Sequence, residues 1–457
     1  MADYMNLNDW RGPFHDPDDA PNDYYDSSDE DGYSSNEDER PASVLDLPSE
    51  LLNKICSYLT ADDHGSARRA CGDLFLRTTH SYYTIAFGMI KTDLSLGSLQ
   101  RLDRLSKNKD KAPYVRTLWI TCPNSEDKYV EMLWTFYRDG RLVLPQPGTK
   151  WLQDIVRRLT NCVSFWFSHD KRDQSVWSHP TIADTVSIIL PTLADVKRRV
   201  KEFKFSSNHQ EGRNLHPFIE LDPVPHAGSP EIWSELESLW LGIDKLRGQI
   251  SPIQFGLRLL PHAPKLRRII LRFDRYSRMS ETVELMDCLL TGTFPFRLET
   301  LVLEDIFGIE EASLGTFLRS HSQTLRDLRL TSIYLDRGHW SAIFKSLATR
   351  GTFPALTAIQ LDSLSEGSLK SQDVKFHRLF KNPRVDRARG TQIECSEEET
   401  DEWMPRVTHC VLYSGPRMDL ALKRIANGAS LGKAFPREHI GTEPPPRVWD
   451  QYSDLSP

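Results

Sequence analysis

Residues 298–330, LETLVLEDIFGIEEASLGTFLRSHSQTLRDLRL, contain the pattern that decides the fold of most of this chain. The segment begins and ends with the same six-residue pattern: apolar, two polar, apolar, any, apolar. The last two apolar positions alternate with an outward one, as in a short half-buried β-strand. Between the copies, Leu314, Phe317 and Leu318 lie on one side of an expected helix. One strand and one helix per period can bury a continuous core only by stacking.

The same six-residue pattern occurs along residues 115–361. Its copies are Val115, Leu118, Ile120; Val200, Phe203, Phe205; Leu236, Leu239, Leu241; Leu266, Ile269, Leu271; Leu298, Leu301, Leu303; Leu325, Leu328, Leu330; and Leu356, Ile359, Leu361. A weaker copy with one extra residue is Leu159, Val163, Phe165, and a late candidate is Val407, Cys410, Leu412. Between copies lie amphipathic helical stretches, so the sequence predicts an α/β fold for residues 115–415.

This arrangement resembles the long, irregular leucine-rich repeats of F-box proteins. The resemblance implies a solenoid with parallel strands inside the curve and helices outside. The alternative is a doubly wound α/β domain. The strands of such a domain usually read as continuous buried runs, and its phosphate-binding glycines are absent from this sequence.

A second decisive stretch is 45–75, LDLPSELLNKICSYLTADDHGSARRACGDLF. Pro48 suits the first position of a helix, and Glu50 places negative charge at its positive end. Leu51, Leu52 and Ile55, with Leu59 beyond them, recur at helical spacing and predict one apolar face.

A second helix is expected directly after the first. Asp62 or Asp63 can cap it. We expect Ala67 and Ala70 on its buried side, and Arg68 and Arg69 on its outer side. About 30 residues cannot bury enough surface to be stable alone, so this module should pack on its own chain or on a partner.

The stretch Leu-Pro-x-Glu-Leu-Leu-x-x-Ile-x-x-Tyr-Leu, with Arg68, Cys71 and Leu74 after it, resembles an F-box. F-boxes imply docking onto the Skp adaptor of a cullin-based (SCF) ubiquitin ligase. The resemblance assigns the adaptor interface to Leu47, Pro48, Leu51, Leu52, Ile55, Leu59, Cys71 and Leu74. The sequence departs from the family at 64–66, His-Gly-Ser, where many relatives carry an aliphatic residue. The alternative is an ordinary helical hairpin packed on its own domain.

Composition divides the chain into an acidic head and a nearly neutral body. Residues 1–40 contain 13 Asp or Glu and two Arg, and their aliphatic content is low, so residues 1–43 should be disordered. Ser27, Ser28, Ser34 and Ser35 each have an acidic residue three positions on, which suits phosphorylation by an acid-preferring kinase. The alternative role of this segment is an acidic solubilising tail.

The remaining segments complete the expected domain plan. The F-box-like module spans 44–80, and residues 81–114 form a bridge with a strand at HSYYTIAF and a helix whose stripe is Leu96, Leu99, Leu102 and Leu105. Long loops interrupt the repeats at 206–231 and 365–405, and residues 416–457 form a C-terminal cap with a flexible tail from Pro436.

No residue pattern in the sequence predicts an active site. The nucleophile-elbow, phosphate-loop, dinucleotide and HExxH motifs are absent. His209, His216, His226 and Asp222 share one loop but are spaced irregularly, which favours surface residues over a metal site. The seven cysteines are scattered without a CxxC pair. We therefore expect a non-enzymatic protein without a metal or cofactor.

The outward residues of the expected strands are candidates for substrate binding. They are Trp119, Lys204, Trp240, Ile270, Val302, Arg329 and Gln360, followed by Arg272, Glu304, Thr331 and Asp362. In a curved stack they would line the concave sheet, the usual binding surface of solenoids. Several are apolar or aromatic, which suits a protein partner unless a loop or the C-terminal tail covers them.

Together these features predict a substrate-recruiting subunit of a cullin-type ubiquitin ligase. The alternatives are an F-box scaffold outside a ligase, a repeat-based binding module without a ubiquitin function, and an enzyme whose site forms in the long loops. No apolar run reaches the roughly 20 residues that span a membrane, and no signal-peptide pattern opens the chain. We expect an intracellular, soluble protein that binds neither nucleic acid nor membrane.

Overall fold

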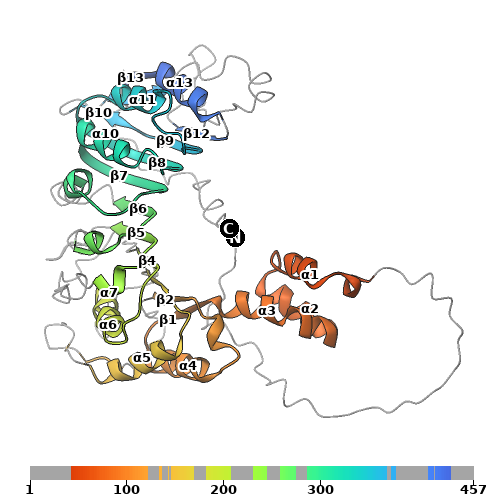
Figure 1. The fold of residues 1–457 in the computed structure, drawn as a ribbon. Coiled ribbons are helices and arrows are strands. Elements are labelled where there is room, and N and C mark those ends of the chain that lie inside the picture. Colours follow the sequence, from red (N-terminus) through yellow and green to blue (C-terminus); the bar gives the residue numbers. More distant parts are fainter. Residues whose placement is uncertain are drawn as a thin grey trace, which may run out of the picture.

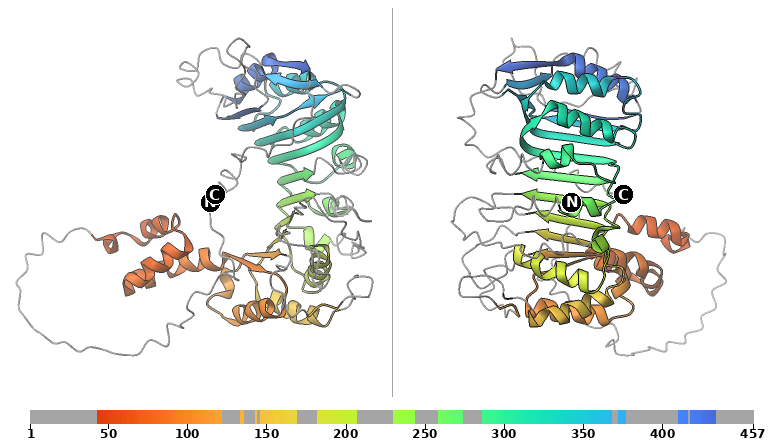
Figure 2. Two further views of the ribbon diagram at one scale, coloured as in Figure 1. Left: turned by 180° about the vertical axis from the view of Figure 1, so that it is seen from behind. Right: turned by 60° about the vertical axis from the view of Figure 1, so that its left-hand side comes forward.

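The computed structural model describes residues 43–121, 133–135, 143, 146–168, 182–206, 230–243, 258–273, 286–367, 372–376, 410–415 and 417–433. These residues form a stack of strands and helices, from which a three-helix arm extends (Figure 1, Figure 2). The acidic head, with Ser27, Ser28, Ser34 and Ser35, and the loop histidines His209, His216 and His226 lie outside the described residues.

The arm, residues 43–88, contains three α-helices. They are α1 (Ser49–Cys56), α2 (Ala61–Ala70) and α3 (Gly72–Gly88), preceded by a short 3₁₀ turn at Val44–Asp46. Helix α3 leads directly into the first strand, and Tyr83 near its end packs against the core of the stack. The expected strand at HSYYTIAF is therefore wrong: these residues are helical, because Tyr83 and Phe87 meet Tyr114 and the core at helical spacing.

The stack, residues 89–433, is built on one sheet of thirteen described strands. The strands are β1 (Met89–Thr92), β2 (Thr117–Thr121), β3 (Ser164–Ser168), β4 (Glu202–Ser206), β5 (Ser238–Ile243), β6 (Arg268–Phe273), β7 (Thr300–Glu310), β8 (Asp327–Arg337), β9 (Ala358–Asp362), β10 (Ser365–Glu366), β11 (Gln372–Phe376), β12 (Cys410–Ser414) and β13 (Ala429–Lys433). Strands β1 to β9 are parallel and pair in chain order, so the expected mixed α/β fold with parallel strands is confirmed.

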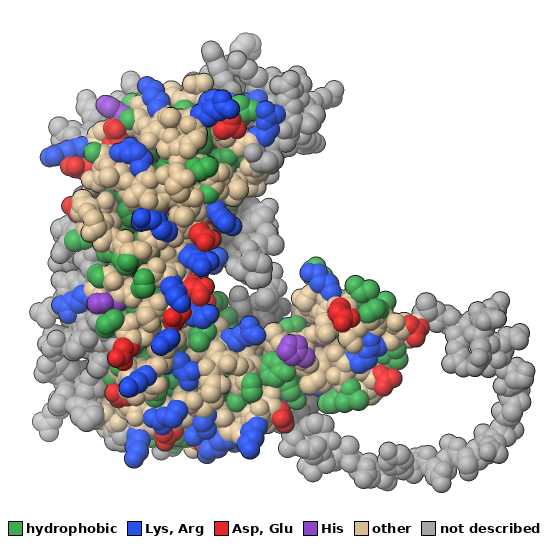
Figure 3. Space-filling view, viewed as in Figure 1, with side chains coloured by type: hydrophobic (Ala, Val, Ile, Leu, Met, Phe, Trp, Pro, Cys, Tyr) green, Lys and Arg blue, Asp and Glu red, His purple; other side chains and the backbone are tan. Residues whose placement is uncertain are grey.

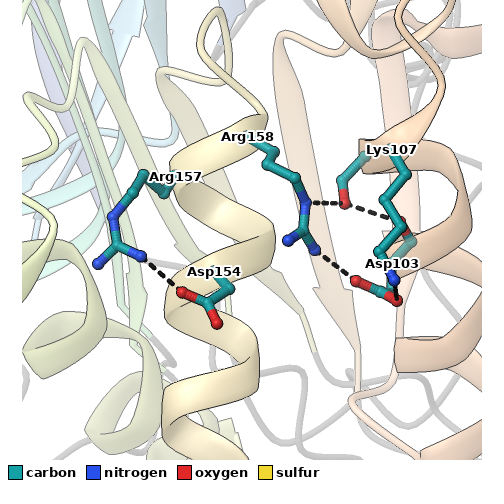
Figure 4. A network of polar contacts seen from close by, with 6 residues as sticks. Asp103, Lys107, Asp154, Arg157 and Arg158 are labelled. Carbon is teal, nitrogen blue, oxygen red and sulfur yellow. Dashed lines mark hydrogen bonds and ion pairs between the residues drawn. The ribbon is translucent and has the colours of Figure 1, made fainter.

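Helices cover one face of the sheet (Figure 1, Figure 2). They are α4 (Leu96–Lys107), α5 (Pro147–Arg158), α6 (Ile182–Asp195), α7 (Pro230–Trp233), α10 (Glu311–Ser320), α11 (Trp340–Ala348) and α13 (Met418–Gly428). Their apolar sides meet the inward residues of the strands in one continuous core. Figure 4 shows that polar contacts also join neighbouring helices, because Arg158 of α5 pairs with Asp103 and donates to Ser106 Oγ (2.9 Å) of α4.

The strand register explains the six-residue pattern. In the copy at 298–303, Leu298 and Leu301 are 0% and 1% exposed, and Leu303 is fully buried. The carbonyl directly before each of the strands β2 to β8 accepts two amides from the next copy; Glu237 O, for example, accepts from the amides of Arg267 and Arg268. Repetition of this bond fixes the copies from β2 to β9 in the same register, so equivalent residues lie side by side along the stack.

Two predicted copies are placed differently by the structure. The copy near residue 160 is Cys162, Phe165 and Phe167, without an extra residue, because Phe165 and Phe167 pair with Leu118 and Ile120 of the neighbouring strand. The late candidate, Cys410 with Leu412, belongs to β12, which runs antiparallel to β9. There Val411 and Tyr413 are the most deeply buried side chains, so the proposed copy was one residue out of register.

The sheet forks at β8. Its first half, Asp327–Thr331, pairs with β9, whereas Tyr334 and Leu335 pair with β10. Strand β10 continues antiparallel into β11 and then β13, and β9 pairs with antiparallel β12. The expected loop at 365–405 is therefore partly wrong, since it contains β10 and β11. The loop predicted at 206–231 ends in α7, and residues 207–229 lie outside the described part.

Candidate protein-binding surfaces

Side-chain hydrogen bonds join the elements of the arm. Arg77 of α3 donates to the carbonyls of Leu45 and Leu47, which fixes the turn before α1. Ser81 of α3 donates to Asn53 Oδ1 at 2.5 Å, which joins α3 to α1. These bonds position α1 on α3.

Arg68 lies inside the arm, contrary to the expectation that it faces outward. Its side chain is 7% exposed, and its guanidinium carbon lies 4.1 Å and 4.5 Å from the ring centres of Phe75 and Tyr82. It also donates to Thr79 Oγ1 at 3.1 Å. Ala70, expected to be buried, is exposed. Arg68 turns inward because its guanidinium is attracted to the faces of the aromatic rings on α3.

His64 lies beside Arg68 and is fully buried. Neither ring nitrogen has a hydrogen-bond partner in the structure. Burial, together with the charge of Arg68, lowers the pKa of this imidazole below its ordinary value. His64 occupies the position where the F-box resemblance leads us to expect an aliphatic residue, so it is a neutral, space-filling residue here.

Two capping residues also differ from the prediction. Pro48 is the residue before α1 rather than its first residue, and Thr60 caps α2 by accepting from the amide of Asp63 at 3.2 Å. Cys71, assigned by resemblance to the adaptor interface, caps α3 by accepting from the amide of Leu74 at 3.4 Å. Its sulfur therefore has a structural role in the arm itself.

The outer side of α1 exposes large apolar side chains. Leu51 and Ile55 are 53% and 46% exposed, and Tyr58 just beyond the helix is 76% exposed. These residues are spaced by four and three positions and so lie on one side. Leu52 and Cys56, in contrast, are 2% and 3% exposed and face α3. We call the set Leu51, Ile55 and Tyr58 the α1 face.

Further apolar side chains are exposed elsewhere on the arm. Val44, Phe75, Leu76 and Ile85 are 48%, 39%, 71% and 36% exposed. Figure 3 shows hydrophobic side chains gathered on the arm. Of the other residues assigned to the adaptor interface, Pro48 is exposed and Leu47, Leu59 and Leu74 are half-buried. Tyr58, which lies inside the matched motif, and Leu76, two residues after Leu74, are also exposed, although the sequence did not predict that they contribute to this surface.

The second surface is the sheet face opposite the helices. Register places one row of side chains across ten strands, and we call it the ladder row: Lys91, Trp119, Trp166, Lys204, Trp240, Ile270, Val302, Arg329, Gln360 and Leu412. All seven outward residues predicted from the pattern lie in this row. Arg272, Glu304, Thr331 and Asp362 form the next row on the same face.

The first half of the ladder row combines two ammonium groups with three indole rings, in the order Lys91, Trp119, Trp166, Lys204, Trp240. Lys204 Nζ lies 3.3 Å from the ring centre of Trp240 and 4.8 Å from that of Trp166. Lys91 Nζ lies 5.2 Å from the ring centre of Trp119. Burial between the rings lowers the pKa of Lys204 to about 8, while the nearby charge of Glu202 acts in the opposite direction.

The second half of the ladder row is less available than predicted. Val302 and Gln360 are only 6% and 7% exposed, so their side chains are not accessible to a partner as the expected apolar stripe required. Arg329 is held by Asp327 at 2.8 Å, and Arg272 lies 3.6 Å from Glu304. These cations are already paired, because carboxylates stand beside them on the same face.

Trp166 and Lys91 belong to the ladder row but were not predicted from the sequence. Trp166 was missed because the copy around residue 162 was read out of register. Lys91 was missed because β1 follows a helix that resembles a strand in composition. The pattern Phe87, Ile90, Thr92 was the available signal for β1, since Phe87 and Ile90 are buried and Thr92 pairs with Ile120.

The described residues contain no group of three or more His, Cys, Asp or Glu side chains that could hold a metal ion. Within the same residues, no helix combines the length and apolar character needed to cross a membrane.

Comparison with known proteins identifies no family. No protein-family model matches the chain, and no curated protein sequence matches it. Among solved structures, the chain is similar to one described as "Crystal structure of TLR13-ssRNA13 complex", with 12% identity and a TM-score of 0.21. The match covers 56% of this chain and 36% of that chain. A similarity of this size assigns neither a family nor a ligand.

Proposed function

We propose that this protein recruits a substrate to a cullin-based ubiquitin ligase, as an F-box protein with leucine-rich-repeat-like units. The arm docks on a Skp-type adaptor, and the stack holds a protein substrate. The observation that carries the proposal is the α1 face, where Leu51 and Ile55 of the F-box-like motif are about half exposed.

Physical chemistry supports a partner at this face. Monomeric proteins rarely leave several large apolar side chains exposed together, and such patches mark interaction sites. The arm hides few of its own apolar residues, so apolar contacts from a partner would stabilise it. The chain itself performs no covalent step in this proposal; it raises the effective concentration of a substrate near the ubiquitin-carrying enzyme.

The first test is co-expression of the full chain with a Skp-type adaptor, followed by purification through this chain. We expect a stoichiometric complex. The double substitution Leu51→Asp with Ile55→Asp should abolish it, because two carboxylates would be buried against an apolar partner. Circular dichroism should remain that of the wild type, since both side chains are exposed.

Lys150→Asp is the matched control. It lies on α5 in the stack rather than on the arm, is exposed, and changes the net charge by the same two units as the double substitution. We expect the Lys150→Asp protein to retain the adaptor. Equal loss of the adaptor in both variants would attribute the effect to charge and overturn the assignment of the α1 face. Co-purification of a cullin would separate a ligase subunit from a scaffold that binds the adaptor alone.

A further inference from the structure

The first half of the ladder row has a chemistry that selects its ligand. Lys204 lies on β4 between the indoles of Trp166 on β3 and Trp240 on β5. An ammonium group carries three donors. No described residue accepts a hydrogen bond or forms an ion pair with Lys204; its partners are the two ring faces. The site therefore presents a half-buried cation whose donors are left for an external acceptor.

The nearest carboxylate does not supply this acceptor. Glu202 lies two residues earlier on the same face of β4, and its charge acts on Lys204, but no ion pair joins them among the described residues. The indole nitrogens of Trp166 and Trp240 are also buried without a hydrogen-bond partner in the structure. The two ring faces therefore form apolar walls on both sides of one cation.

A second ammonium lies in the same row at a defined separation. Lys91 and Lys204 are joined by the register pairs Lys91–Trp119, Trp119–Trp166 and Trp166–Lys204, which are three strand spacings. At about 4.8 Å per spacing, the two positions lie roughly 14 Å apart. An extended peptide rises about 3.4 Å per residue, and alternate side chains face the same side. Four residues therefore span the gap with both end side chains facing the sheet.

We propose that strands β1 to β5 bind an extended acidic segment of the substrate, with anionic side chains at positions i and i+4 and an aromatic or aliphatic side chain at i+2. The anions meet Lys91 and Lys204, and the central side chain packs on Trp119 and Trp166. The anions are carboxylates or phosphates. This inference rests on the proposed function, because it names the class of segment that the stack would hold.

A peptide fits this face better than a nucleic acid. Nucleic acids carry a phosphate on every nucleotide and require many cations. Here Glu202, Glu304, Asp327 and Asp362 lie on the same face, and Arg272 and Arg329 are already paired. A peptide with a few anionic side chains separated by apolar ones matches a face that has few unpaired cations and several carboxylates.

The test is titration of the full chain, without adaptor, with fluorescently labelled peptides read by anisotropy. The probe is GGDSFSDGG, with controls GGDSFDSGG, which shortens the spacing to three, and GGKSFSKGG, which reverses the charge. We expect the first peptide to bind at least fivefold more tightly than either control. A version with phosphoserine at both acidic positions distinguishes phosphate from carboxylate recognition by its relative affinity.

The variants test the role of Lys204. Lys204→Met should weaken binding of the matching peptide at least fivefold, and Lys204→Arg should restore most of it. Lys201→Met is the matched control, because Lys201 lies on the edge of the same sheet region, three residues earlier, and pairs with Glu237 at 3.4 Å. Circular dichroism and thermal unfolding establish that each variant is folded.

Three outcomes would overturn the proposal. They are equal binding of all peptides, equal weakening by Lys204→Met and Lys201→Met, or tighter binding of a ten-nucleotide single-stranded oligothymidine. The two proposals fail separately. The Leu51→Asp, Ile55→Asp protein should bind the peptide as the wild type does, and Lys204→Met should still co-purify with the adaptor. Peptide binding without adaptor binding would retain the ladder site and reject the adaptor role.

Discussion

The arm and the stack differ in how much of their large apolar side chains they bury. Of the eight large hydrophobic residues that are exposed in the described part of the chain, seven lie in the arm and one, Leu431, lies in the stack. The stack joins its helices and strands through one apolar core that runs along its length. The arm places Arg68 and His64 inside instead. The stack therefore buries nearly all of its large apolar side chains within the chain, whereas the arm leaves several of its own exposed.

Buried histidines show the same difference on a small scale. In the stack, His321 accepts from the amide of Leu298 at 3.4 Å and stacks on Phe296. In the arm, both ring nitrogens of His64 are without partners in the structure. A buried polar group without a partner reduces stability, so His64 is a position in the arm where a substitution can increase stability.

The largest expected effect is on the core of the stack. Leu330 on β8 is 0% exposed, and Leu330→Ala should lower the free energy of unfolding by about 3 kcal/mol, because it removes buried methyl groups and leaves a cavity. Urea denaturation followed by tryptophan fluorescence measures this change. A loss below about 1 kcal/mol would show that the stack is not the tightly packed region.

The next effect depends on pH. Burial, with the charge of Arg297 nearby, lowers the pKa of His321 to about 4 from an ordinary value of 6.5. Between these values the unfolded chain binds a proton that the folded chain excludes. Stability is therefore full above pH 6.5 and falls toward pH 4, by at most about 3 kcal/mol. His321→Gln should flatten this part of the profile of unfolding free energy against pH; an unchanged slope would assign the acid sensitivity to other groups.

A smaller effect of opposite sign is expected in the arm. His64→Leu replaces two unpartnered nitrogens by an apolar side chain of similar size and should stabilise the arm by about 1 kcal/mol. Hydrogen exchange of α2 and α3 amides reports the change locally. The matched variant in the stack, His321→Leu, should be destabilising, because the Leu298 amide loses its acceptor. Destabilisation of the arm by His64→Leu would contradict the contrast between the two histidines.

The smallest effect separates stability from binding. Leu51→Ala should change the free energy of unfolding by less than about 0.5 kcal/mol, because the side chain is 53% exposed. We nevertheless expect it to weaken adaptor binding about tenfold, measured by titration of the purified partners. A large loss of stability would mean that the α1 face already packs within the chain.

Much of the stack could be predicted from the sequence because its pattern is local. Leu298, Leu301 and Leu303 identify their strand without knowledge of the neighbours. At residue 162 the pattern was ambiguous, since Cys162 and Val163 are adjacent and only pairing with β2 decides between them. Most residues of the ladder row could be predicted because they occupy the outward position of this local pattern. Trp166 could not, because its strand was assigned the wrong register.

The arm was predicted less well because its interior depends on contacts between helices. Nothing within α2 indicates that Arg68 turns inward; the rings that receive it, Phe75 and Tyr82, lie on α3. The same holds for HSYYTIAF, whose composition favours a strand. Packing of Tyr83 on Tyr114, with ring centres 5.3 Å apart, favours the helix instead.

The fork at β8 determines where such a chain can lengthen in evolution. Between β2 and β7 each strand offers its successor the same register, so duplication of one strand-helix unit there would insert a copy that both neighbours accept. After β8 the sheet divides, and β12 and β11 run antiparallel to the strands they follow. A duplicated unit inserted after β8 would have no parallel strand to pair with. Duplication is therefore compatible with the sheet only between β2 and β7, where it would lengthen the ladder row and increase the distance between its two ends.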